Sequence, residues 1–273
     1  MAQSINLFYW SSKIFENKEL ENYGDLLSAY IVEQCSGREV QFFNAPAQRK
    51  AWFKKEYLMA IGSILSYATK KATVWGSGII SKEDTPGSAK YCAVRGPLSR
   101  KRIQELGYVC PEVYGDPALL LPTFYNPSIS KTNKLGIVPH YVDYEGVKND
   151  YGNEIKVIDL MTDNWKKTTD HICSCEAIIS SSLHGVIVAH AYGIPAIWVQ
   201  FSNKLSGDNT KYADYFYSVG LKPYEGVLIN TIKTGKELLT LVNERENLPD
   251  QLYLNQIKEG LEQAFPLKYI GAS

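Results

Sequence analysis

The sequence predicts an α/β protein with two Rossmann-like domains that face each other across a cleft. Short apolar, β-prone runs alternate with helical periodicity along most of the chain, which is typical of parallel sheets covered by helices. The alternation stops in the polar segment at residues 123–133 and then starts again. This segment is rich in proline, asparagine and serine, as interdomain linkers are. The predicted domains are residues 1–122 and 134–273, with the C-terminal helices free to pack back on the first domain.

The first domain opens with an expected strand at residues 4–10, followed by the tight turn Asn22-Tyr23-Gly24-Asp25. Asp25 is placed to cap the first long helix, whose apolar residues recur with helical spacing. Asn22, Gly24 and Asp25 are also candidates for lining the cleft. Further strands are expected at residues 40–43, 57–62, 73–79, 90–95 and 112–115.

Several of these strands end in residues that suit a ligand site. Gly62-Ser63 and Gly76-Ser77-Gly78 are loops where a missing side chain lets the backbone approach a ligand, although tight turns alone would explain them. We therefore keep Gly76 and Ser77 as candidates for lining the cleft.

Arg95 is the candidate for binding an anion in the first domain. It ends the strand expected at 90–95 and precedes a helix with Pro97 in its first turn. An arginine held at such a junction is well placed to bind a carboxylate or phosphate with two parallel hydrogen bonds.

The second domain repeats the alternation of strands and helices. Strands are expected at 134–143 and 154–160, a helix near 163–174, and another helix from near Lys211. His140 follows an apolar run and is expected at the carboxyl end of its strand. Two more helical stretches close the chain.

The stretch AIISSSLHGVIVAHAYGIPAIW, residues 177–198, gives the strongest indication of a site. An apolar strand stops at three serines, a helix from Gly185 to Tyr192 follows, and a second strand comes after it. His184 is then expected in the turn between the strand and the helix, where free N–H groups attract anions. The alternative is a serine cap followed by a packing histidine.

Composition disfavours several classes of function. Lys plus Arg and Asp plus Glu number 29 each and form no long block, which argues against a broad surface for nucleic acid or an anionic membrane. The five cysteines include no pair with zinc or thioredoxin spacing, so we expect reduced thiols in a cytoplasmic protein. Neither a signal peptide nor a run of about 18 apolar residues is present, so no integral membrane segment is expected.

Common catalytic motifs are missing as well. The sequence has no phosphate-binding loop of NTPases, no G-x-G-x-x-G, no H-E-x-x-H and no G-x-S-x-G. No carboxylate cluster has the spacing of metal ligands, so we expect neither a metal nor a cofactor.

What remains is a set of cationic and small polar residues at predicted turns. Such a set suits a small, densely anionic substrate, because a phosphate and a carboxylate on one molecule need two cationic contacts and a proton donor between them. The set consists of Arg95, Ser182, His184, Gly185, Lys204 and Lys211.

These residues lie in segments that together resemble the polysaccharide pyruvyl transferase family. The matching segments run in family order from about residue 20 to residue 221: NYGDLLSAYIVEQ, WGSGI, VRGPLSRKRIQELG, YGDPALLLP, LGIVPHYVD, SSSLHGVIVAHAYGIPAIW and SNKLSGDNTKYADYFYSVG. The resemblance implies a two-domain arrangement like that of GT-B glycosyltransferases. It also implies transfer of a pyruvyl unit from phosphoenolpyruvate to two hydroxyls of a sugar, which forms a cyclic ketal and releases phosphate.

The resemblance implies roles for the donor-side residues. His184, in L-H-G, is expected near phosphoenolpyruvate as a general acid, with Ser182 and Gly185 beside it. Arg95, in V-R-G-P, is expected to hold an anionic group of the donor. Lys211 matches a basic position of the family, and Lys204 is its nearby alternative.

The acceptor side is less defined. The resemblance implies that Asn22, Gly24 and Asp25, in N-x-G-D, line the cleft or contact the acceptor, whereas His140 matches a histidine without an assigned role. The acceptor could be a polymer or a lipid-diphosphate-linked glycan, and a lipid-linked acceptor would bring the protein to the inner face of the membrane. Galactose, glucose and N-acetylmannosamine remain open as the acceptor sugar.

Two other functions stay open from the sequence. A GT-B glycosyltransferase would use the same cleft for a nucleotide sugar in place of phosphoenolpyruvate. A non-catalytic protein that binds glycans or phosphosugars would keep the fold without the reaction. The presence of Arg95, His184 and Lys211 favours the transferase.

Overall fold

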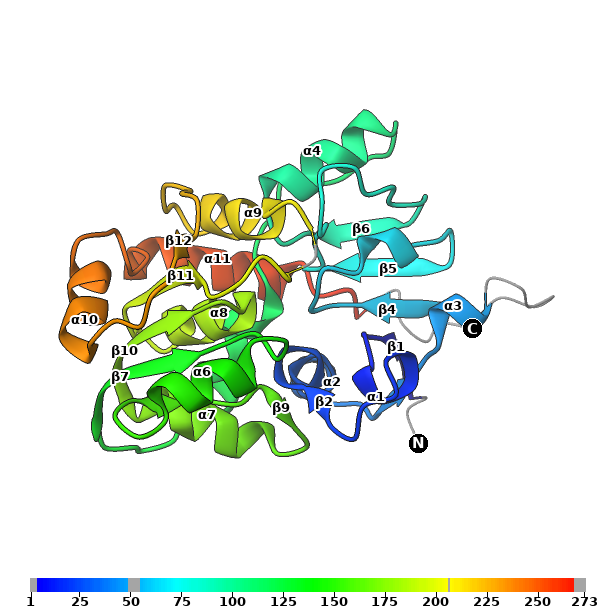
Figure 1. Cartoon of the computed structure of the whole chain (residues 1–273). Helices are drawn as coiled ribbons and strands as arrows, with labels where there is room; N and C mark the ends of the chain where they lie inside the picture. Colours follow the sequence, from blue (N-terminus) through cyan, green and yellow to red (C-terminus); the bar gives the residue numbers. More distant parts are fainter. Residues whose placement is uncertain (1–3, 49–54, 206, 268–273) are drawn as a thin grey trace.

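The computed structural model describes residues 4–48, 55–205 and 207–267 and shows two parallel sheets surrounded by helices (Figure 1). An α/β fold with parallel sheets is thus confirmed. The first sheet consists, in spatial order, of β3 (Val40–Phe42), β1 (Ile5–Phe8), β4 (Tyr57–Met59), β5 (Ala72–Trp75) and β6 (Lys90–Ala93). The second consists of β12 (Val227–Leu228), β11 (Ala196–Gln200), β10 (Cys175–Ser180), β7 (Asn133–Val138) and β8 (Lys156–Val157).

Both sheets have the same strand order. Numbered by appearance within its own sheet, each reads 2-1-3-4-5, the flavodoxin-like order. The direction of winding reverses between β1 and β4 in the first sheet and between β7 and β10 in the second. Open α/β sheets bind ligands at the carboxyl ends of the strands beside such a reversal.

Helices cover the sheets and join them. They are α1 (Ser12–Phe15), α2 (Tyr23–Ser36), α3 (Ala45–Gln48), α4 (Pro97–Glu105), α5 (Leu121–Phe124), α6 (Tyr144–Tyr151), α7 (Trp165–Cys173), α8 (Leu183–Ala191), α9 (Thr210–Ser218), α10 (Gly235–Asn243) and α11 (Gln251–Gln263). The 3₁₀ helices η1 (Leu65–Tyr67) and η2 (Pro117–Leu120) complete the set, and η2 packs against both α2 and α8.

One apolar core joins the inner faces of both sheets. Leu7 and Leu58 of the first sheet and Ile178 and Trp198 of the second belong to the same buried cluster. The outer faces of the sheets belong to two separate clusters. Phe8 of the first sheet packs in one cluster, and the second sheet packs against α6 and α10 in the other. Because the inner core is shared, neither sheet completes its packing alone.

Two helices fill the space between the sheets (Figure 1). Helix α2 contributes buried residues such as Leu27 to the shared core, and α11 contributes Leu254 and Leu261. The indole of Trp75 in β5 donates a hydrogen bond of 2.8 Å to the carbonyl of Leu261. The last helix thus packs against the first sheet.

A two-stranded antiparallel sheet also crosses between the two parts of the chain. Strand β2 (Glu21–Asn22) pairs with β9 (Met161–Thr162). Nearby, the buried hydroxyl of Tyr23 lies 2.8 Å from that of Thr169 in α7. These contacts fix the start of α2 against the second part of the chain.

Three of the predicted elements differ from the structure. Helix α2 begins at Tyr23 and is capped by Asn22, whose side chain accepts a hydrogen bond from the N–H of Gly24, so Asp25 lies within the first turn and is not the cap. Residues 112–115 form no strand, because only Tyr114 makes a single bridge, to Val94. Helix α8 begins at Leu183 rather than at Gly185, so His184 lies in the first turn of the helix and not in the loop before it. Residues 125–132 carry no helix or strand, within the segment expected to be a linker.

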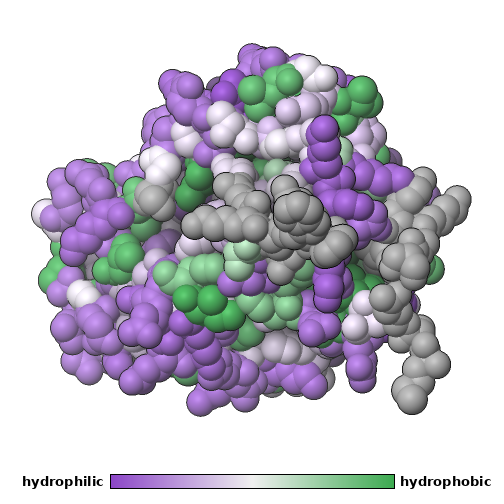
Figure 2. Space-filling model, turned by 90° about the vertical axis from the view of Figure 1, so that its right-hand side faces the viewer, coloured by the Kyte–Doolittle hydropathy of each residue, from purple (hydrophilic) through white to green (hydrophobic). Residues whose placement is uncertain are grey.

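The surface is mixed in character. Hydrophilic side chains cover most of the face seen in Figure 2, and hydrophobic ones gather near its middle. Among the described residues, every helix is too short or too polar to span a membrane.

Candidate functional site

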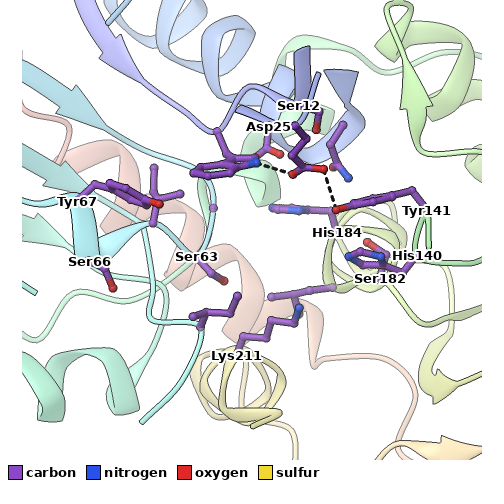
Figure 3. A pocket seen from close by; sticks show the side chains of 17 residues that line it. Ser12, Asp25, Ser63, Ser66, Tyr67, His140, Tyr141, Ser182, His184 and Lys211 are labelled. Carbon is purple, nitrogen blue, oxygen red and sulfur yellow. Dashed lines mark hydrogen bonds between the residues drawn. The ribbon is translucent and has the colours of Figure 1, made fainter. Parts of the chain in front are cut away.

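A cavity of about 370 Å³ lies between the two sheets (Figure 3). Its walls come from loops after β1, β4, β7 and β10, which are the strands beside the two reversals of winding. The two ligand-binding edges therefore face the same space. The cavity is lined by Trp10, Ser12, Glu16, Asn22, Asp25, Gly62, Ser63, Ile64, Ser66, Tyr67, Ile80, His140, Tyr141, Ser182, Leu183, His184 and Lys211.

Six of the predicted site residues are brought together here: Asn22, Asp25, His140, Ser182, His184 and Lys211. Their elements are far apart in the sequence, since α2, α8 and α9 each supply at least one of them. In Figure 3, His184 projects into the middle of the cavity, with Asp25 on one side and Lys211 on the other.

The turn before α8 is built by serine hydroxyls. Ser180 Oγ donates to the carbonyl of Val138 at 2.7 Å and accepts from the N–H of Ser182 at 3.0 Å. Ser182 is the residue that precedes the helix, but its side chain makes no capping hydrogen bond. Its hydroxyl and the first N–H groups of α8 thus lie at the cavity wall, where a helix N-terminus favours an anion.

His184 is packed between α2 and a buried carboxylate. A Cβ added to Gly24 would lie 2.1 Å from Nδ1 of His184, so the ring rests directly on the glycine. On the other side, Nε2 lies 3.7 Å from Oδ2 of Asp116, a residue with only 1% of its surface exposed. Both atoms are buried and lack a hydrogen-bond partner among the described residues. Unsatisfied buried polar atoms are costly, so a small shift that joins these two would be favourable.

Asp25 is the carboxylate that reaches the cavity beside His184. Burial raises its pKa to about 7, and the nearby charges of Glu21, Glu16 and Asp116 act in the same direction, while His184 opposes them. A carboxylate with a pKa near neutrality can both accept and release a proton during a reaction.

Lys211 supplies the positive charge of the cavity. Burial, aided by the charge of Arg95, lowers its pKa to about 8. His140 lies on the same wall, where burial and the charge of Lys211 lower its pKa to about 4. His140 is therefore neutral at physiological pH and can act as a hydrogen-bonding group, whereas Lys211 remains largely protonated.

Aromatic rings and a carboxylate form another part of the lining, which begins beside His140, since the rings of His140 and Tyr141 lie 4.4 Å apart. Glu16 accepts a hydrogen bond from the indole of Trp10 at 2.7 Å and another from the hydroxyl of Tyr141 at 3.0 Å (dashed in Figure 3). Trp10 follows β1 and Tyr141 follows β7, so this carboxylate links the two ligand-binding edges. Burial and the Glu16 hydrogen bond raise the pKa of Tyr141 to about 12, which keeps its proton in place on that bond.

Arg95 does not line the cavity. Its side chain is 1% exposed, and Nε and Nη2 lie 3.1 and 3.0 Å from Oδ2 of Asp214. Nη2 also donates to the carbonyl of Ile79, and Nη1 donates to Ser63 Oγ at 2.7 Å. The guanidinium thus makes its hydrogen bonds within the protein, and Ser63 is the partner that lines the cavity. Asp214 takes the place of the anionic ligand that the sequence suggested for Arg95.

The remaining predicted residues also lie outside the cavity wall. Gly185 packs against Ser180 Oγ and Val138, and Gly24 lies beneath His184. Gly76 adopts a positive φ of 95° and packs against Pro117. Ser77 is buried and donates to the carbonyl of Ala60 at 2.7 Å. Lys204 lines a different cavity.

Sequence reasoning missed Trp10, Glu16, Tyr141 and Asp116 as site residues. Trp10 and Tyr141 lie at or near the carboxyl ends of the strands predicted at 4–10 and 134–143, so their position at a strand end was a usable signal. Asp116 also followed an expected strand, but an Asp-Pro pair usually indicates only a cap, and Asp116 does cap η2 through Ala118. Glu16 gave no signal, because it follows the short helix α1 rather than a strand, and its partners Trp10 and Tyr141 lie in two other segments.

The described residues contain no group of three or more His, Cys, Asp or Glu side chains gathered as metal ligands.

Comparison with known proteins places the chain in a family. The family model of polysaccharide pyruvyl transferase matches residues 22–203, well over half of the chain. Cavity residues Trp10, Ser12, Glu16 and Lys211 lie outside this range.

Two relatives illustrate the similarity. An uncharacterized protein, L143, of Acanthamoeba polyphaga mimivirus is 33% identical over 175 residues, 59% of this chain and 60% of the relative. The succinoglycan biosynthesis protein ExoV of Rhizobium meliloti (strain 1021) is 25% identical over 233 residues, 78% of this chain and 65% of the relative. The chain thus spans less than two thirds of the length of either relative. On the evidence of the family match, the chain belongs to the polysaccharide pyruvyl transferase family.

Proposed function

We propose that the protein transfers a pyruvyl group from phosphoenolpyruvate to two hydroxyls of a sugar in a polysaccharide or its precursor, forming a cyclic ketal and releasing phosphate. Family membership supports this class of reaction. The observation that carries the proposal is the cavity between the two sheets, whose lining combines a lysine, two histidines and a helix N-terminus with aromatic rings and carboxylates. The similar strand orders of the facing sheets support a GT-B-like arrangement.

The donor is proposed to bind at the cationic wall. Lys211 takes part in none of the ion pairs found among the described residues, so its charge is available to an anion. Ser182 and the N-terminus of α8 add hydrogen-bond donors beside it. His140, being neutral, donates or accepts a hydrogen bond without repelling the donor.

His184 is the proposed general acid. It points into the cavity between Lys211 and Asp25 (Figure 3). Asp116 is the proposed positioning residue, because its unpartnered Oδ2 faces the unpartnered Nε2 of the imidazole. When Nε2 is turned to Asp116, Nδ1 is the ring nitrogen left to exchange a proton with the substrate.

The acceptor sugar is proposed to bind along the aromatic part of the cavity lining. The rings of Trp10, Tyr67 and Tyr141 offer apolar faces, and Glu16 fixes two of these side chains. Asp25 lies between this wall and His184, where its raised pKa suits a base that takes a proton from a sugar hydroxyl.

These groups account for the protons and the leaving phosphate of the reaction. His184 protonates the methylene carbon of phosphoenolpyruvate, and a sugar hydroxyl adds to the neighbouring carbon while Asp25 takes its proton. The bond from that carbon to the phosphate oxygen breaks, and the second hydroxyl closes the ketal. Of the two hydroxyl protons released, one restores His184 and the other leaves with phosphate.

The proposal is tested by mixing the purified protein with phosphoenolpyruvate and glycans that end in galactose, glucose or N-acetylmannosamine. We expect equal amounts of phosphate and ketal with at least one acceptor. His184→Ala should lower the rate roughly 100- to 10,000-fold at saturating phosphoenolpyruvate, because it removes the proton donor. Near-normal ketal formation by this variant would overturn the general-acid role. Turnover of a nucleotide sugar in place of phosphoenolpyruvate would overturn the reaction.

Asp116→Asn separates positioning from folding. The asparagine retains an oxygen to cap η2 but loses the negative charge facing Nε2. We expect kcat to fall roughly 10- to 100-fold with little change in KM, because the imidazole is less well oriented. The ¹⁵N NMR signals of His184 should show a changed tautomer. Unchanged kcat and an unchanged tautomer would show that Asp116 acts only as a cap.

A further inference from the structure

A second cavity lies on the same side of the second sheet. Its volume is about 330 Å³, and it opens at the carboxyl ends of β11 and β12 beside α6. Phe201 and Ser202 follow β11, and Asn230 follows β12. This is again the edge at which parallel sheets bind ligands, and the volume is within the range of small-molecule sites.

A buried carboxylate with an unsatisfied oxygen lines this cavity. Asp143 is 8% exposed, and its Oδ1 accepts a hydrogen bond of 2.5 Å from Ser202 Oγ. Its Oδ2 has no hydrogen-bond partner among the described residues. Asp143 precedes α6, yet its side chain does not cap that helix. Less than 1 Å² of this oxygen is exposed, so a ligand donor reaches it only after a shift of the cavity wall, and a buried acceptor without a partner gains most from a hydroxyl or N–H donor.

The other lining residues limit the kind of ligand. Asp143 and Asp150 contribute two carboxylates against the single ammonium of Lys204, so a phosphate or diphosphate is disfavoured. Asn230 and Ser202 add neutral hydrogen-bonding groups, and Phe201 adds an aromatic ring. A ligand with several hydroxyls and apolar C–H faces matches this mixture, which is the description of a neutral sugar.

The two cavities share one loop. His140 and Tyr141 line the first cavity, and the next two residues, Val142 and Asp143, line the second. A chain of sugars whose terminal unit lies beside Tyr141 can therefore continue along this loop.

We propose that the second cavity binds the next sugar of the acceptor glycan, a neutral hexose unit held by Asp143, Ser202 and Asn230. This inference rests on the proposed function, because it assumes that the first cavity holds the terminal sugar. It adds that the protein distinguishes acceptors by length as well as by terminal sugar, and it gives Lys204 a place in acceptor binding rather than donor binding.

The test fills the second cavity without touching the first. Gly146 lies in α6 and lines the cavity, and a Cβ added to it would meet nothing within 4 Å. Gly146→Phe should place a ring in the cavity. Asn149→Phe adds the same ring at an exposed position of α6 that does not line the cavity, so it is the matched control.

Kinetics with a methyl monosaccharide and with a disaccharide ending in the same sugar give the readout. We expect the wild type and Asn149→Phe to have at least a tenfold lower KM for the disaccharide. Gly146→Phe should lose this preference while its KM values for phosphoenolpyruvate and the monosaccharide stay unchanged. Equal KM values for both acceptors in the wild type, or a loss that is the same for both acceptors in Gly146→Phe, would overturn the inference.

Asp143→Asn serves as a second variant that keeps the volume of the side chain, and it should weaken the disaccharide alone. If no acceptor is turned over at all, the proposed function fails and the second cavity is tested by binding. Saturation-transfer NMR with the disaccharide, in the absence of phosphoenolpyruvate, should then show contact of the inner sugar in Asn149→Phe and none of that sugar in Gly146→Phe. Equal signals from both variants would overturn the inference.

Discussion

The pKa of Lys211 lies close to the pH at which this lysine must be charged to bind an anionic donor. Burial and the charge of Arg95 lower its pKa to about 8, from an ordinary value of 10.5. The affinity for an anionic donor should therefore fall about tenfold between pH 7 and pH 9, as the ammonium loses its proton. The phosphate group of the donor, with a second pKa of about 6, keeps its charge over this range.

The measurement is calorimetric titration with phosphoenolpyruvate across that range. Lys211→Arg should bind with nearly constant affinity up to pH 9, because a guanidinium does not titrate there. The stability of the free protein should change in the opposite direction. Between pH 8 and pH 10.5 the unfolded chain binds more protons at this lysine, so the free energy of unfolding rises with pH. A flat affinity profile in the wild type would contradict a role for Lys211 in binding the donor.

Gly24 sets the position of His184. Gly24→Ala should displace the imidazole, since the new Cβ would lie 2.1 Å from Nδ1 while α2 is fixed by its packing. We expect kcat to fall at least tenfold, although alanine is by itself favoured over glycine in a helix by roughly 1 kcal/mol. Gly260→Ala, at another helical glycine whose added Cβ would meet only Val113 at 3.9 Å, should keep full activity. Equal activity of the two variants would show that the ring adapts without loss.

At the scale of elements, Arg95 and Asp214 join the start of α4 to α9. Both side chains are almost fully buried, at 1% and 0% exposure. Arg95→Met should lower the free energy of unfolding by about 3–5 kcal/mol, because it leaves a buried carboxylate without its positive partner. Lys13→Met, which breaks the exposed pair with Asp163, should cost less than about 1 kcal/mol.

Urea denaturation followed by circular dichroism measures both effects. If Arg95 instead served mainly to hold the donor, Arg95→Met would weaken phosphoenolpyruvate binding while leaving the unfolding midpoint in place. The two readouts therefore separate a structural role from a binding role.

The elements also show what could be read from the sequence. The periodicity of the chain predicted most strands and helices, because each depends on neighbouring residues. This periodicity could not distinguish an arginine that binds a ligand from one that binds Asp214, which follows 119 residues later. The pairing of β2 with β9 was hidden as well, since strands of two residues leave no alternating pattern. Residues that line the candidate cavity were predicted where they lie at strand ends, and they were missed where a side chain, such as that of Glu16, follows a short helix.

At the scale of the whole molecule, the shared core predicts one unfolding transition. The inner faces of both sheets pack into the same cluster together with α2, α8 and α11. Unfolding monitored by tryptophan fluorescence and by far-UV circular dichroism should therefore coincide. Two separated transitions would show that the two sheets fold independently.

Leu261→Ala is the sharper form of this prediction. Leu261 is fully buried in the shared core, and its carbonyl accepts the indole hydrogen bond of Trp75. The variant should lose about 2–5 kcal/mol of stability, and both probes should shift together. Leu252→Ala, on the exposed side of the same helix, should change little. A shift confined to one probe would contradict a common core.

The packing of α11 against the first sheet also constrains how the protein is made. The strands of that sheet leave the ribosome early, yet α11 follows every other described element in the chain. Until it arrives, the inner face around Trp75 lacks one of its covering helices and exposes apolar surface. Nascent chains of this protein are therefore expected to need protection from aggregation until α11 has emerged from the ribosome. The cavity, whose walls come from both sheets, cannot form before Lys211 has emerged.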